Sequence, residues 1–472
     1  MRYDVAVVGG GTAGCVVAAR LSEDGARTVC LLEAGPDYGP FAGGSWPADL
    51  LDPRDLTFTH DWGRGGEDQR SLGARVIGGC STHNACMALM GTRADYDEWG
   101  DTWEWARFAP YVERARATLD VRPANTSDPA PLHVAFLEAA ANLGLPFLDD
   151  PDDPTRPTGA ARLPVNAVGG TRWNTAFAYL DPARGRPNLT VVPDTCVDRI
   201  ALDGARATGV VTASGESIEA DVIVLTAGAY FTPAILLRSG IGPEAELARH
   251  DIPVIAALPV GEVLLDHHGT GVAWPANAAL DRRTADHVRR TGPLYSPHAF
   301  VKAASSRCDK ASWDIHLVSW TNEADEGDGY EASVGVFHMK PASVGRVRLR
   351  SRDPHELPDV ERGFLREPSD LLTVVEGLEL TRALASQEPL ARLLGPERVP
   401  GDEPLEDYTR RMMRNYFHPA GTCGIRRVVD TSGRVLGVEQ LFVADASIMP
   451  TIPRANTNLT TVAIAERLAE DI

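Results

Sequence analysis

The chain has 472 residues, of which 43% are hydrophobic and 24% charged, an ordinary composition for a globular protein. Because this length is large for one compact core, we expect two domains. The formal net charge is 46 − 65 = −19, and a surface that negative argues against nucleic acid or an anionic membrane as a partner.

The apolar run near the N-terminus, Val5–Val8, is too short for the core of a signal peptide or for a membrane-spanning helix. The 7 cysteines are scattered along the chain, and no two are spaced as C-x-x-C. An odd number of scattered cysteines favours reduced thiols over a disulfide framework or a zinc site. We therefore expect a cytoplasmic protein with no bound metal.

The first predicted unit is a strand, a helix and a second strand. Asp4–Val8 and Val29–Leu32 are short apolar runs typical of buried strands, and residues 12 to about 23 show the helical spacing of apolar residues. The segment Gly9–Gly14, between the first strand and the helix, matches the pattern G-x-G-x-x-G. This order of elements predicts a dinucleotide-binding βαβ unit.

The residues of this pattern have distinct roles. Gly9 permits a tight turn, Gly11 lets a pyrophosphate approach the backbone, and Gly14 lets the helix pack on the strand. Thr12 and Ala13 begin the helix, whose free N–H groups attract phosphates. The pattern therefore predicts a pyrophosphate at the start of the helix.

Glu33 stands at the end of the second strand, 19 residues after Gly14. A carboxylate at this place accepts hydrogen bonds from the ribose hydroxyls of a dinucleotide, and it disfavours a 2′-phosphate. The pattern thus predicts FAD or NAD rather than NADP, and it does not choose between FAD and NAD.

Two further glycine-rich blocks follow. In Gly73–Ala85, paired glycines precede small hydroxyl residues, which makes a backbone-lined loop that a flat ring can approach closely. In Gly228–Gly242, a helix is expected between two glycine breaks. These two blocks are more specific than an ordinary glycine turn.

Short strands are predicted around these blocks. Leu189–Val192, Ala207–Thr212 and Ser217–Ile218 have the pattern of a hairpin-like stretch, and Asp221–Leu225 is a further buried strand.

Residues from about 270 to 420 are richer in Arg, His and aromatic residues. They contain strand-like runs at Trp313–Trp320, Ser333–Met339 and Gly345–Arg350, which predict a separate substrate-facing sheet. Phe442–Ala444 returns to the buried-strand pattern, and Leu459–Leu468 is expected to form a closing helix. The cofactor domain is therefore expected to be built from both ends of the chain.

Both glycine-rich blocks, together with the tail Phe417–Ile472, resemble the signatures of the glucose–methanol–choline family of FAD oxidoreductases. The resemblance covers nearly the whole chain. It implies an α/β fold with a bipartite Rossmann-like FAD-binding domain and a substrate domain that holds a large antiparallel sheet and helices. The expected boundaries are 1–268 and 426–472 for the FAD-binding domain and 269–425 for the substrate domain.

The resemblance also implies which residues surround the FAD. Val197 would contact the adenine end, and Asp445 and Ala446 would lie at the pyrophosphate and ribityl chain. The remaining expected cofactor residues form the loop around the flavin ring or the segment beside it: Gly78, Gly79, Ser81, His83, Asn84, Ala85, Asn456, Thr457 and Asn458. His83 resembles the histidine that bonds covalently to the flavin in the choline-oxidising branch, and a non-bonded neighbour of the ring is the alternative.

His418 and Asn456 are the expected catalytic pair. An alcohol loses its hydroxyl proton as its α-carbon gives hydride to the flavin, and an imidazole that titrates near neutral pH can take that proton. The amide of Asn456 cannot titrate, but it can orient the alcohol oxygen by hydrogen bonding. His316 is a weaker pocket candidate, whereas His267, His298 and His338 could equally be surface or structural residues.

The predicted substrate is a small primary or secondary alcohol. Gly269 occupies the place where choline oxidisers carry a glutamate, and the tail Ile448–Leu459 is similar to members that oxidise furfuryl or aryl alcohols. Tyr416 stands where many oxygen-using members carry a small apolar residue, so molecular oxygen and another electron acceptor both remain open. An oligomer is compatible with this sequence.

Two other functions remain open at this point. The same residues could serve a tailoring enzyme or lyase that acts on a biosynthetic intermediate, or a flavin-binding protein without turnover. Retention of both His418 and Asn456 argues against the last of these.

Overall fold

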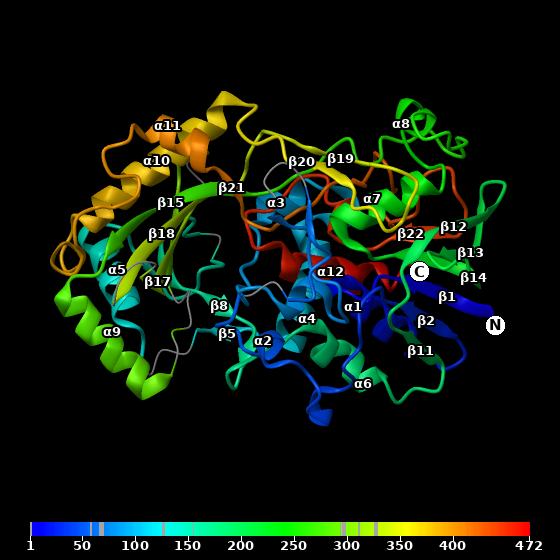
Figure 1. The fold of residues 1–472 in the computed structure, drawn as a ribbon, viewed down its shortest axis with the longest axis horizontal. Helices are drawn as coiled ribbons and strands as arrows, with labels where there is room; N and C mark the ends of the chain where they lie inside the picture. The colour runs from blue at the N-terminus through cyan, green and yellow to red at the C-terminus, as the bar shows by residue number, and fades with distance from the viewer. Residues whose placement is uncertain are drawn as a thin grey trace.

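The computed structural model describes residues 2–56, 59–65, 70–124, 128–153, 155–292, 294, 299–309, 312–324 and 329–472. Its elements form two lobes, each built around a large sheet, with both chain termini in the lobe on the right of Figure 1. Among the described residues, no helix is long and apolar enough to cross a membrane.

The sheet of the terminal lobe has the order β11-β2-β1-β14-β13-β12, with β22 also paired to β14. β1 pairs in parallel with β2 and β14, while β13 pairs antiparallel with β12 and β14. Its strands are β1 (Arg2–Val8), β2 (Val29–Leu32), β11 (Leu189–Val192), β12 (Val197–Asp203), β13 (Arg206–Thr212), β14 (Ser217–Leu225) and β22 (Leu441–Val443).

The sheet of the other lobe has the order β21-β15-β18-β17-β16-β7-β6, and its pairs are antiparallel except for β6 with β7. Its strands are β6 (Phe147–Leu148), β7 (Gly159–Arg162), β15 (His268–Pro275), β16 (Ala299–Ala303), β17 (Ile315–Glu323), β18 (Tyr330–His338) and β21 (Arg414–Asn415). Short two-stranded pairs complete the strands: β3 (Arg64–Gly65) with β4 (Arg70–Ser71), β5 (Arg122–Pro123) with β8 (Pro164–Val165), β9 (Ala167–Val168) with β10 (Thr171–Arg172), and β19 (Arg346–Arg348) with β20 (Asp359–Glu361).

Helices cover both sheets and connect the lobes. α12 packs against α1 and α4, while α5 and α10 pack against strands of the second sheet. The helices are α1 (Thr12–Leu21), α2 (Ala48–Leu51), α3 (Arg93–Asp97), α4 (Trp105–Thr118), α5 (Pro131–Asn142), α6 (Asp181–Ala183), α7 (Gly228–Arg238), α8 (Glu244–Ala248), α9 (Ala278–Thr291), α10 (Pro368–Ala385), α11 (Leu405–Met412) and α12 (Thr457–Leu468).

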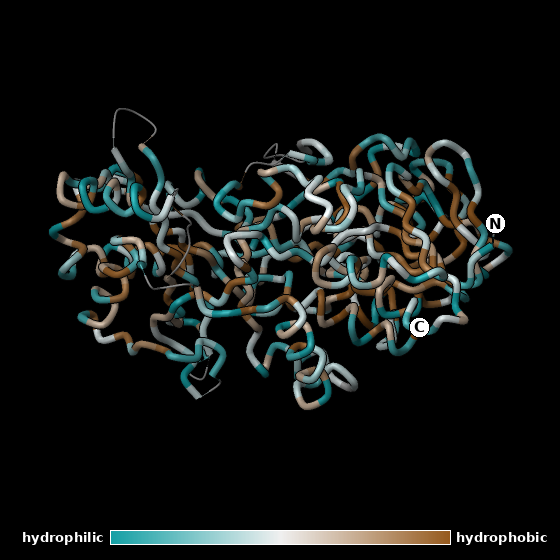
Figure 2. Tube along the Cα trace, turned by 90° about the horizontal axis from the view of Figure 1, so that it is seen from below, coloured by the Kyte–Doolittle hydropathy of each residue, from teal (hydrophilic) through white to brown (hydrophobic). Residues whose placement is uncertain are grey.

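The two ends of the chain meet in the first lobe. β2 is buried along its whole length and β1 over its last residues, which is the pattern of parallel strands covered on both faces. β22 extends this sheet beside β14, and α12 lies against α1, as the red and blue helices at the centre of Figure 1 show. Figure 2 shows the hydrophobic colour concentrated in the strands near the N-terminus. The expectation of a lobe assembled from both ends of the chain is therefore confirmed.

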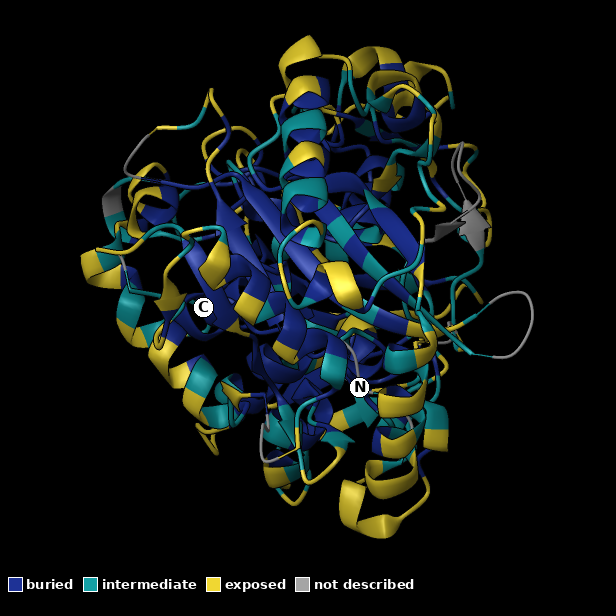
Figure 3. Cartoon of the chain, turned by 90° about the vertical axis from the view of Figure 1, so that its left-hand side faces the viewer, coloured by how far each residue is buried: buried dark blue, intermediate teal, exposed yellow. Residues whose placement is uncertain are grey.

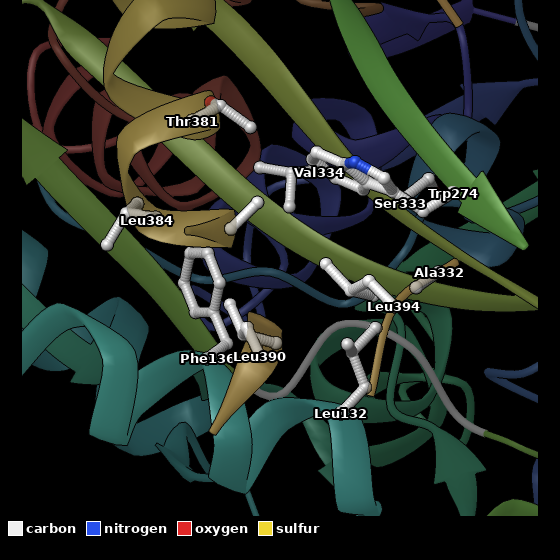
Figure 4. A pocket seen from close by; sticks show the side chains of 11 residues that line it. Leu132, Phe136, Trp274, Ala332, Ser333, Val334, Thr381, Leu384, Leu390 and Leu394 are labelled. Carbon is white, nitrogen blue, oxygen red and sulfur yellow. The ribbon is translucent and has the colours of Figure 1, made fainter. Parts of the chain in front are cut away.

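The second lobe buries its sheet under helices. In Figure 3 the strands are dark blue over much of their length with teal stretches between, whereas the helices packed on them expose one face to solvent. Side chains of α5 and α10 meet those of β15 and β18 around the small pocket drawn in Figure 4, whose volume is about 10 Å³. A void that small holds no more than a water molecule, so it is packing space and not a substrate site.

Several predicted strands need correction. Leu189–Val192 does not belong to a hairpin but pairs in parallel with β2, and the hairpin strand that the sequence analysis missed is β12. Ser217–Ile218 and Asp221–Leu225 are one continuous strand, β14. Gly345–Arg350 contributes only β19, which pairs with β20 outside the large sheet. Turn residues mark where strands end, but they do not specify which strand becomes the neighbour.

The domain boundaries remain a prediction. β6 and β7 belong to the second sheet, although their residues precede 269. The chain therefore contributes to the second lobe earlier than the expected range 269–425.

Candidate active site

A continuous cavity of about 970 Å³ lies between the lobes. One part of its lining comes from Gly9, Gly11 and Glu33 in the first lobe, and another part includes His418 and Asn456. Strands β15 and β18 of the second sheet supply a further wall. The dinucleotide pattern and the expected catalytic pair thus face the same space.

The glycine loop after β1 has the geometry of a dinucleotide turn. Gly9 has φ +100°, and a Cβ on Gly14 would lie 1.8 Å from the carbonyl oxygen of Gly9, so neither position accepts a side chain without movement. Gly11 is the N-cap of α1, and no side chain caps this helix. The first N–H groups of α1 therefore remain available to an anion, and the adjoining residues Thr12 and Ala13 line the cavity.

Glu33 lies beside this loop. Its Oε2 accepts a hydrogen bond from the backbone N–H of Gly10 at 2.8 Å, and its Oε1 accepts one from Gly35 at 2.8 Å. Burial raises the pKa of Glu33 to about 7. The carboxylate is fixed in the cavity wall, and each oxygen keeps further acceptor capacity.

The second glycine-rich block packs directly on the first. Gly79 has φ +51°, and a Cβ there would lie 2.6 Å from the Cα of Gly11. The N–H of Gly78 donates to the carbonyl oxygen of Gly10 at 2.8 Å, and the hydroxyl of Ser81 donates to the carbonyl oxygen of Gly78 at 2.6 Å. Gly79, His83, Asn84 and Ala85 line the cavity, whereas Gly14, Gly78 and Ser81 lie behind this lining and support it.

Arg172 holds this block in place. Its side chain is fully buried and donates to the backbone carbonyl oxygens of Asn84 at 2.9 Å, Thr82 at 2.6 Å, Leu50 at 2.9 Å and Asp52 at 2.8 Å. An arginine satisfied entirely by carbonyl oxygens is a structural clamp. Its positive charge also adds to the effect of burial, which lowers the pKa of His83 to about 4.

His418 lies between two polar partners. Its Nδ1 is 2.8 Å from Nδ1 of His267, and its Nε2 is 3.2 Å from Nδ2 of Asn456. The second nitrogen of His267, Nε2, is 3.1 Å from the carbonyl oxygen of Met339. The backbone N–H of His418 donates to Oδ1 of Asp266 at 2.9 Å, which fixes the loop that carries the imidazole.

This chain of contacts determines which nitrogens carry hydrogen. A carbonyl oxygen only accepts, so Nε2 of His267 carries the proton that bonds to Met339. Nδ1 of His267 is then an acceptor, and Nδ1 of His418 must be the donor in the contact between the two rings. The remaining nitrogen, Nε2 of His418, has no proton and accepts from Asn456.

Burial keeps both rings neutral. Desolvation lowers the pKa of His418 to about 3 and lowers the pKa of His267 well below its usual range. Nε2 of His418 is therefore unprotonated at neutral pH, at the wall of the cavity. The imidazole does not titrate near neutral pH as the sequence had suggested. Oδ1 of Asn456 has no hydrogen-bonding partner in the described part of the chain, so it can accept a hydrogen bond from the hydroxyl of a bound molecule.

An aromatic wall adjoins His418. The rings of Tyr416 and His418 are 4.5 Å apart between centroids, and Tyr416 stacks on Phe337 at 3.6 Å with an angle of 3° between the planes. Phe337, Tyr416 and Trp320 line the cavity. His316 is fully buried behind Tyr416, with 6.0 Å between the ring centroids, and is not among the residues that line the cavity.

The other predicted cofactor residues also lie at this cavity: Val197, Asp445, Ala446, Thr457 and Asn458. Asp445 accepts from the N–H of Gly228 at 2.8 Å and the hydroxyl of Thr232 at 2.6 Å, so it ties α7 to the end of β22. α12 begins at Thr457, and no side chain caps it, which leaves its first N–H groups beside the cavity as in α1.

Sequence reasoning left His267 undecided and missed Arg172 and Phe337. The contact of His267 with His418 joins positions 151 residues apart, so no local pattern reveals it. Phe337 faces the cavity because β18 pairs with β15, and only the register of the sheet shows this. The sequence analysis also left His298 and His338 as surface or structural residues. His298 lies outside the described residues.

Comparisons with known proteins agree with this arrangement. Residues 3–269 and 341–465 match the N-terminal and C-terminal parts of the family described as GMC oxidoreductase. The mitochondrial choline dehydrogenase of Mus musculus is 32% identical, with 100% of this chain and 89% of that protein covered. The oxygen-dependent choline dehydrogenase of Burkholderia ambifaria is 32% identical, with 100% and 93% covered.

A solved structure is similar along the whole chain. The pyridoxine 4-oxidase from Mesorbium loti superposes with a TM-score of 0.86 at 28% identity, and the comparison covers 99% of each chain. The uncapped starts of α1 and α12, the backbone-lined glycine blocks and the size of the cavity fit the phosphates and flat ring of FAD.

Proposed function

The chain belongs to the GMC oxidoreductase family, and from that premise we propose that it oxidises a neutral primary or secondary alcohol, preferably an aryl or heteroaryl carbinol. The protein is an FAD-dependent oxidoreductase that acts on CH–OH donors. Within this activity, the proposal assigns the roles of His418 and Asn456 and the chemical class of the substrate.

The observation that carries the proposal is the unprotonated Nε2 of His418 at the cavity wall. Bound FAD supplies the acceptor for the hydride that leaves the carbinol carbon. His418 takes the hydroxyl proton on Nε2, and its Nδ1–H continues to donate to His267, which stabilises the positive imidazolium. Asn456 orients the alcohol oxygen through its amide.

The carboxylates that line the cavity already have partners, and this favours a substrate without a positive charge. Among the described lining residues, the carboxylates are Glu33, Glu331 and Asp445. Glu33 and Asp445 accept hydrogen bonds from backbone N–H groups, and Glu331 is ion-paired with Arg398. None of these three is left to balance a quaternary ammonium group, which needs a carboxylate or an open aromatic cage.

Gly269 supports the same conclusion. It lies in β15 opposite Phe337, and a Cβ there would be 1.9 Å from the carbonyl oxygen of Val336. A glutamate at this position would therefore require the two strands to separate. The strand geometry of this chain therefore has no room at position 269 for the acidic side chain that, by resemblance, choline oxidisers carry there.

The aromatic wall favours an aryl substrate. Tyr416 lies beside His418 and stacks on Phe337, and both residues line the cavity together with Trp320. Such rings contact another aromatic ring favourably in stacked or edge-to-face geometry. The similarity to a pyridoxine 4-oxidase agrees with an aromatic alcohol, and the similarity to choline dehydrogenases makes choline the alternative substrate.

The test is anaerobic reduction of the bound flavin by a matched set of alcohols. The set contains benzyl alcohol, pyridinylmethanol, choline and 3,3-dimethylbutan-1-ol, which has the shape of choline without its charge. We expect the aryl carbinols to reduce the flavin fastest and the neutral isostere to be at least as good as choline. A choline rate above that of the isostere and of both aryl carbinols would refute the neutral-substrate proposal.

The same set separates the other functions. A tailoring enzyme or lyase would leave the flavin oxidised with simple alcohols and would require a more elaborate substrate, whereas a non-catalytic flavin protein would react with none. Oxygen consumption measured beside dye reduction then distinguishes molecular oxygen from another electron acceptor.

A further inference from the structure

Three buried side chains meet on the second sheet, outside the residues that line the cavity. His268 begins β15, His338 ends β18, and the two residues are register partners. Asp370 lies in the first turn of α10. The relative exposure of the three residues is 0%, 5% and 1%.

Their polar atoms face one another at distances that suit a shared ion. Nε2 of His268 is 3.9 Å from Oδ2 of Asp370, and Nδ1 of His338 is 3.6 Å from Oδ1 of Asp370. One ligand atom from each residue lies within 4.8 Å of the others. Ligands of a tetrahedral ion at metal–ligand distances of about 2.0–2.1 Å are about 3.3 Å apart, so a modest contraction would complete the site.

The histidines lack the hydrogen bonds that buried imidazoles normally make. Among the described residues, no side chain hydrogen-bonds to either ring nitrogen of His268 or to Nδ1 of His338, and the His268 ring interacts with the backbone of Asp266. The distances to Asp370 are too long for hydrogen bonds. A buried nitrogen left unsatisfied destabilises the fold, and a bound cation that accepts the nitrogen lone pairs would remove this cost.

The carboxylate is already oriented toward the histidines. Oδ1 of Asp370 accepts from the backbone N–H of Ala342 at 3.0 Å, and Oδ2 accepts from that of Ser343 at 2.8 Å. Such backbone donors fix a ligating carboxylate and are typical second partners of metal ligands. Arg307 and Arg454 are the positive charges that help to lower the pKa of His338. Both are ion-paired, Arg307 with Glu376 and Arg454 with Asp95.

We propose that His268, His338 and Asp370 bind one divalent transition-metal ion of the Zn²⁺ type. Two imidazoles and one carboxylate suit Zn²⁺ or Co²⁺ better than Mg²⁺ or Ca²⁺, which prefer all-oxygen sites. A water molecule takes the fourth position. The ion ties the paired ends of β15 and β18 to the start of α10. Its role is structural, because none of its three ligands lines the cavity.

The test uses the FAD-loaded enzyme with its affinity tag removed. The protein is treated with a chelator, dialysed against Zn²⁺ and assayed for bound metal by elemental mass spectrometry. We expect about one ion per chain and a higher melting temperature with Zn²⁺ than without it. Substitution with Co²⁺ should give the absorption of a tetrahedral ion at wavelengths longer than the flavin bands.

Two variants and a control make the assignment specific. Asp370→Asn and His338→Gln should lose the ion and the thermal shift while they retain FAD, whereas His250→Gln, a histidine outside the cluster, should keep one ion. Absence of bound metal in the wild-type enzyme, or equal uptake by wild type and both variants, would overturn the proposal. Metal and FAD are measured separately from turnover, so this result stands apart from the proposed alcohol oxidation.

Discussion

Nδ1 of His267 lies 2.8 Å from Nδ1 of His418, and this contact decides which nitrogen of His418 faces the cavity as a base. The carbonyl oxygen of Met339 holds the proton of His267 on the far nitrogen, so the donor in the contact is His418. One backbone carbonyl thereby sets the tautomers of two rings.

His267 is therefore a positioning residue for His418. His267→Leu removes the acceptor and leaves the buried Nδ1–H of His418 unsatisfied, a loss of about 1–3 kcal/mol that corresponds to a roughly 5- to 150-fold slower reduction of the flavin. His267→Asn keeps an acceptor near the original Nδ1 and should recover most of the rate. The check is the pH profile of flavin reduction for both variants, because loss of packing alone would not shift the profile and would not be rescued by Asn.

We expect Asn456 to contribute less than His418 to the reduction of the flavin. Asn456→Ala removes one neutral hydrogen bond to Nε2 of His418, worth about 0.5–1.5 kcal/mol, so flavin reduction should slow by roughly 2- to 10-fold. Asn456→His, which retains a donor, should stay nearer to wild type. Stopped-flow reduction with one aryl carbinol measures all three proteins, and a loss for Asn456→Ala as large as that for His418→Ala would show that the amide has more than an orienting role.

His83 is the residue that we predict to bond covalently to the flavin. The residue lines the cavity, and burial lowers its pKa to about 4, which keeps the imidazole in the neutral form that can attack the ring methyl group. Acid-denatured protein should then keep its yellow colour, and its intact mass should exceed the chain mass by one FAD.

His83→Ala is the matched control for this bond. It should still bind FAD when folded, since Gly9, Gly11 and Glu33 are unchanged, but release it on denaturation. Complete release of FAD from denatured wild-type protein would show that His83 is only a neighbour of the ring.

Stability should fall as the pH falls below about 6.5, because buried histidines resist protonation in the folded state. Burial lowers the pKa of His316 from 6.5 to about 3, so below pH 6.5 the unfolded chain binds a proton that the folded chain does not. The free energy of unfolding then decreases with falling pH by up to about 1.4 kcal/mol per pH unit for this group.

His316→Phe tests this contribution. The ring would be surrounded by Phe300, Trp313 and Tyr416, and the variant cannot titrate. Urea unfolding between about pH 5 and pH 7 should show a shallower pH dependence in the variant than in wild type. The raised pKa of Glu33 has the opposite effect, because it makes the free energy of unfolding increase as the pH falls. This effect is present in both proteins and cancels in the comparison. Identical slopes would mean that the pKa of His316 is the same in the folded and the unfolded state.

The sequence predicted the parts of the site that lie in local motifs. Gly9, Gly11 and Glu33 belong to one βαβ unit, so their spacing and flanking strands sufficed to place them together. His418 and Asn456 were paired through family resemblance, and the structure brings them to 3.2 Å.

Sequence reasoning could not supply contacts that depend on strand register or on long loops. His267 reaches His418 because the segment before β15 runs beside the segment around His418, where Leu265 pairs with Ala420. Phe337 stacks on Tyr416 because β18 pairs with β15. The placement of β11 beside β2 likewise depends on the crossover between them and not on the composition of either strand.

The most direct test of the central claim is anaerobic flavin reduction by a good aryl carbinol in the wild-type enzyme and in His418→Ala. Loss of a positioned proton acceptor should slow reduction by roughly 10²–10⁴-fold, while FAD content and melting temperature remain close to wild type. A high pH that ionises more of the alcohol should recover part of the rate in the variant. Reduction of the flavin by His418→Ala at the wild-type rate, with the same alcohol and at neutral pH, would contradict the role of His418 as the base.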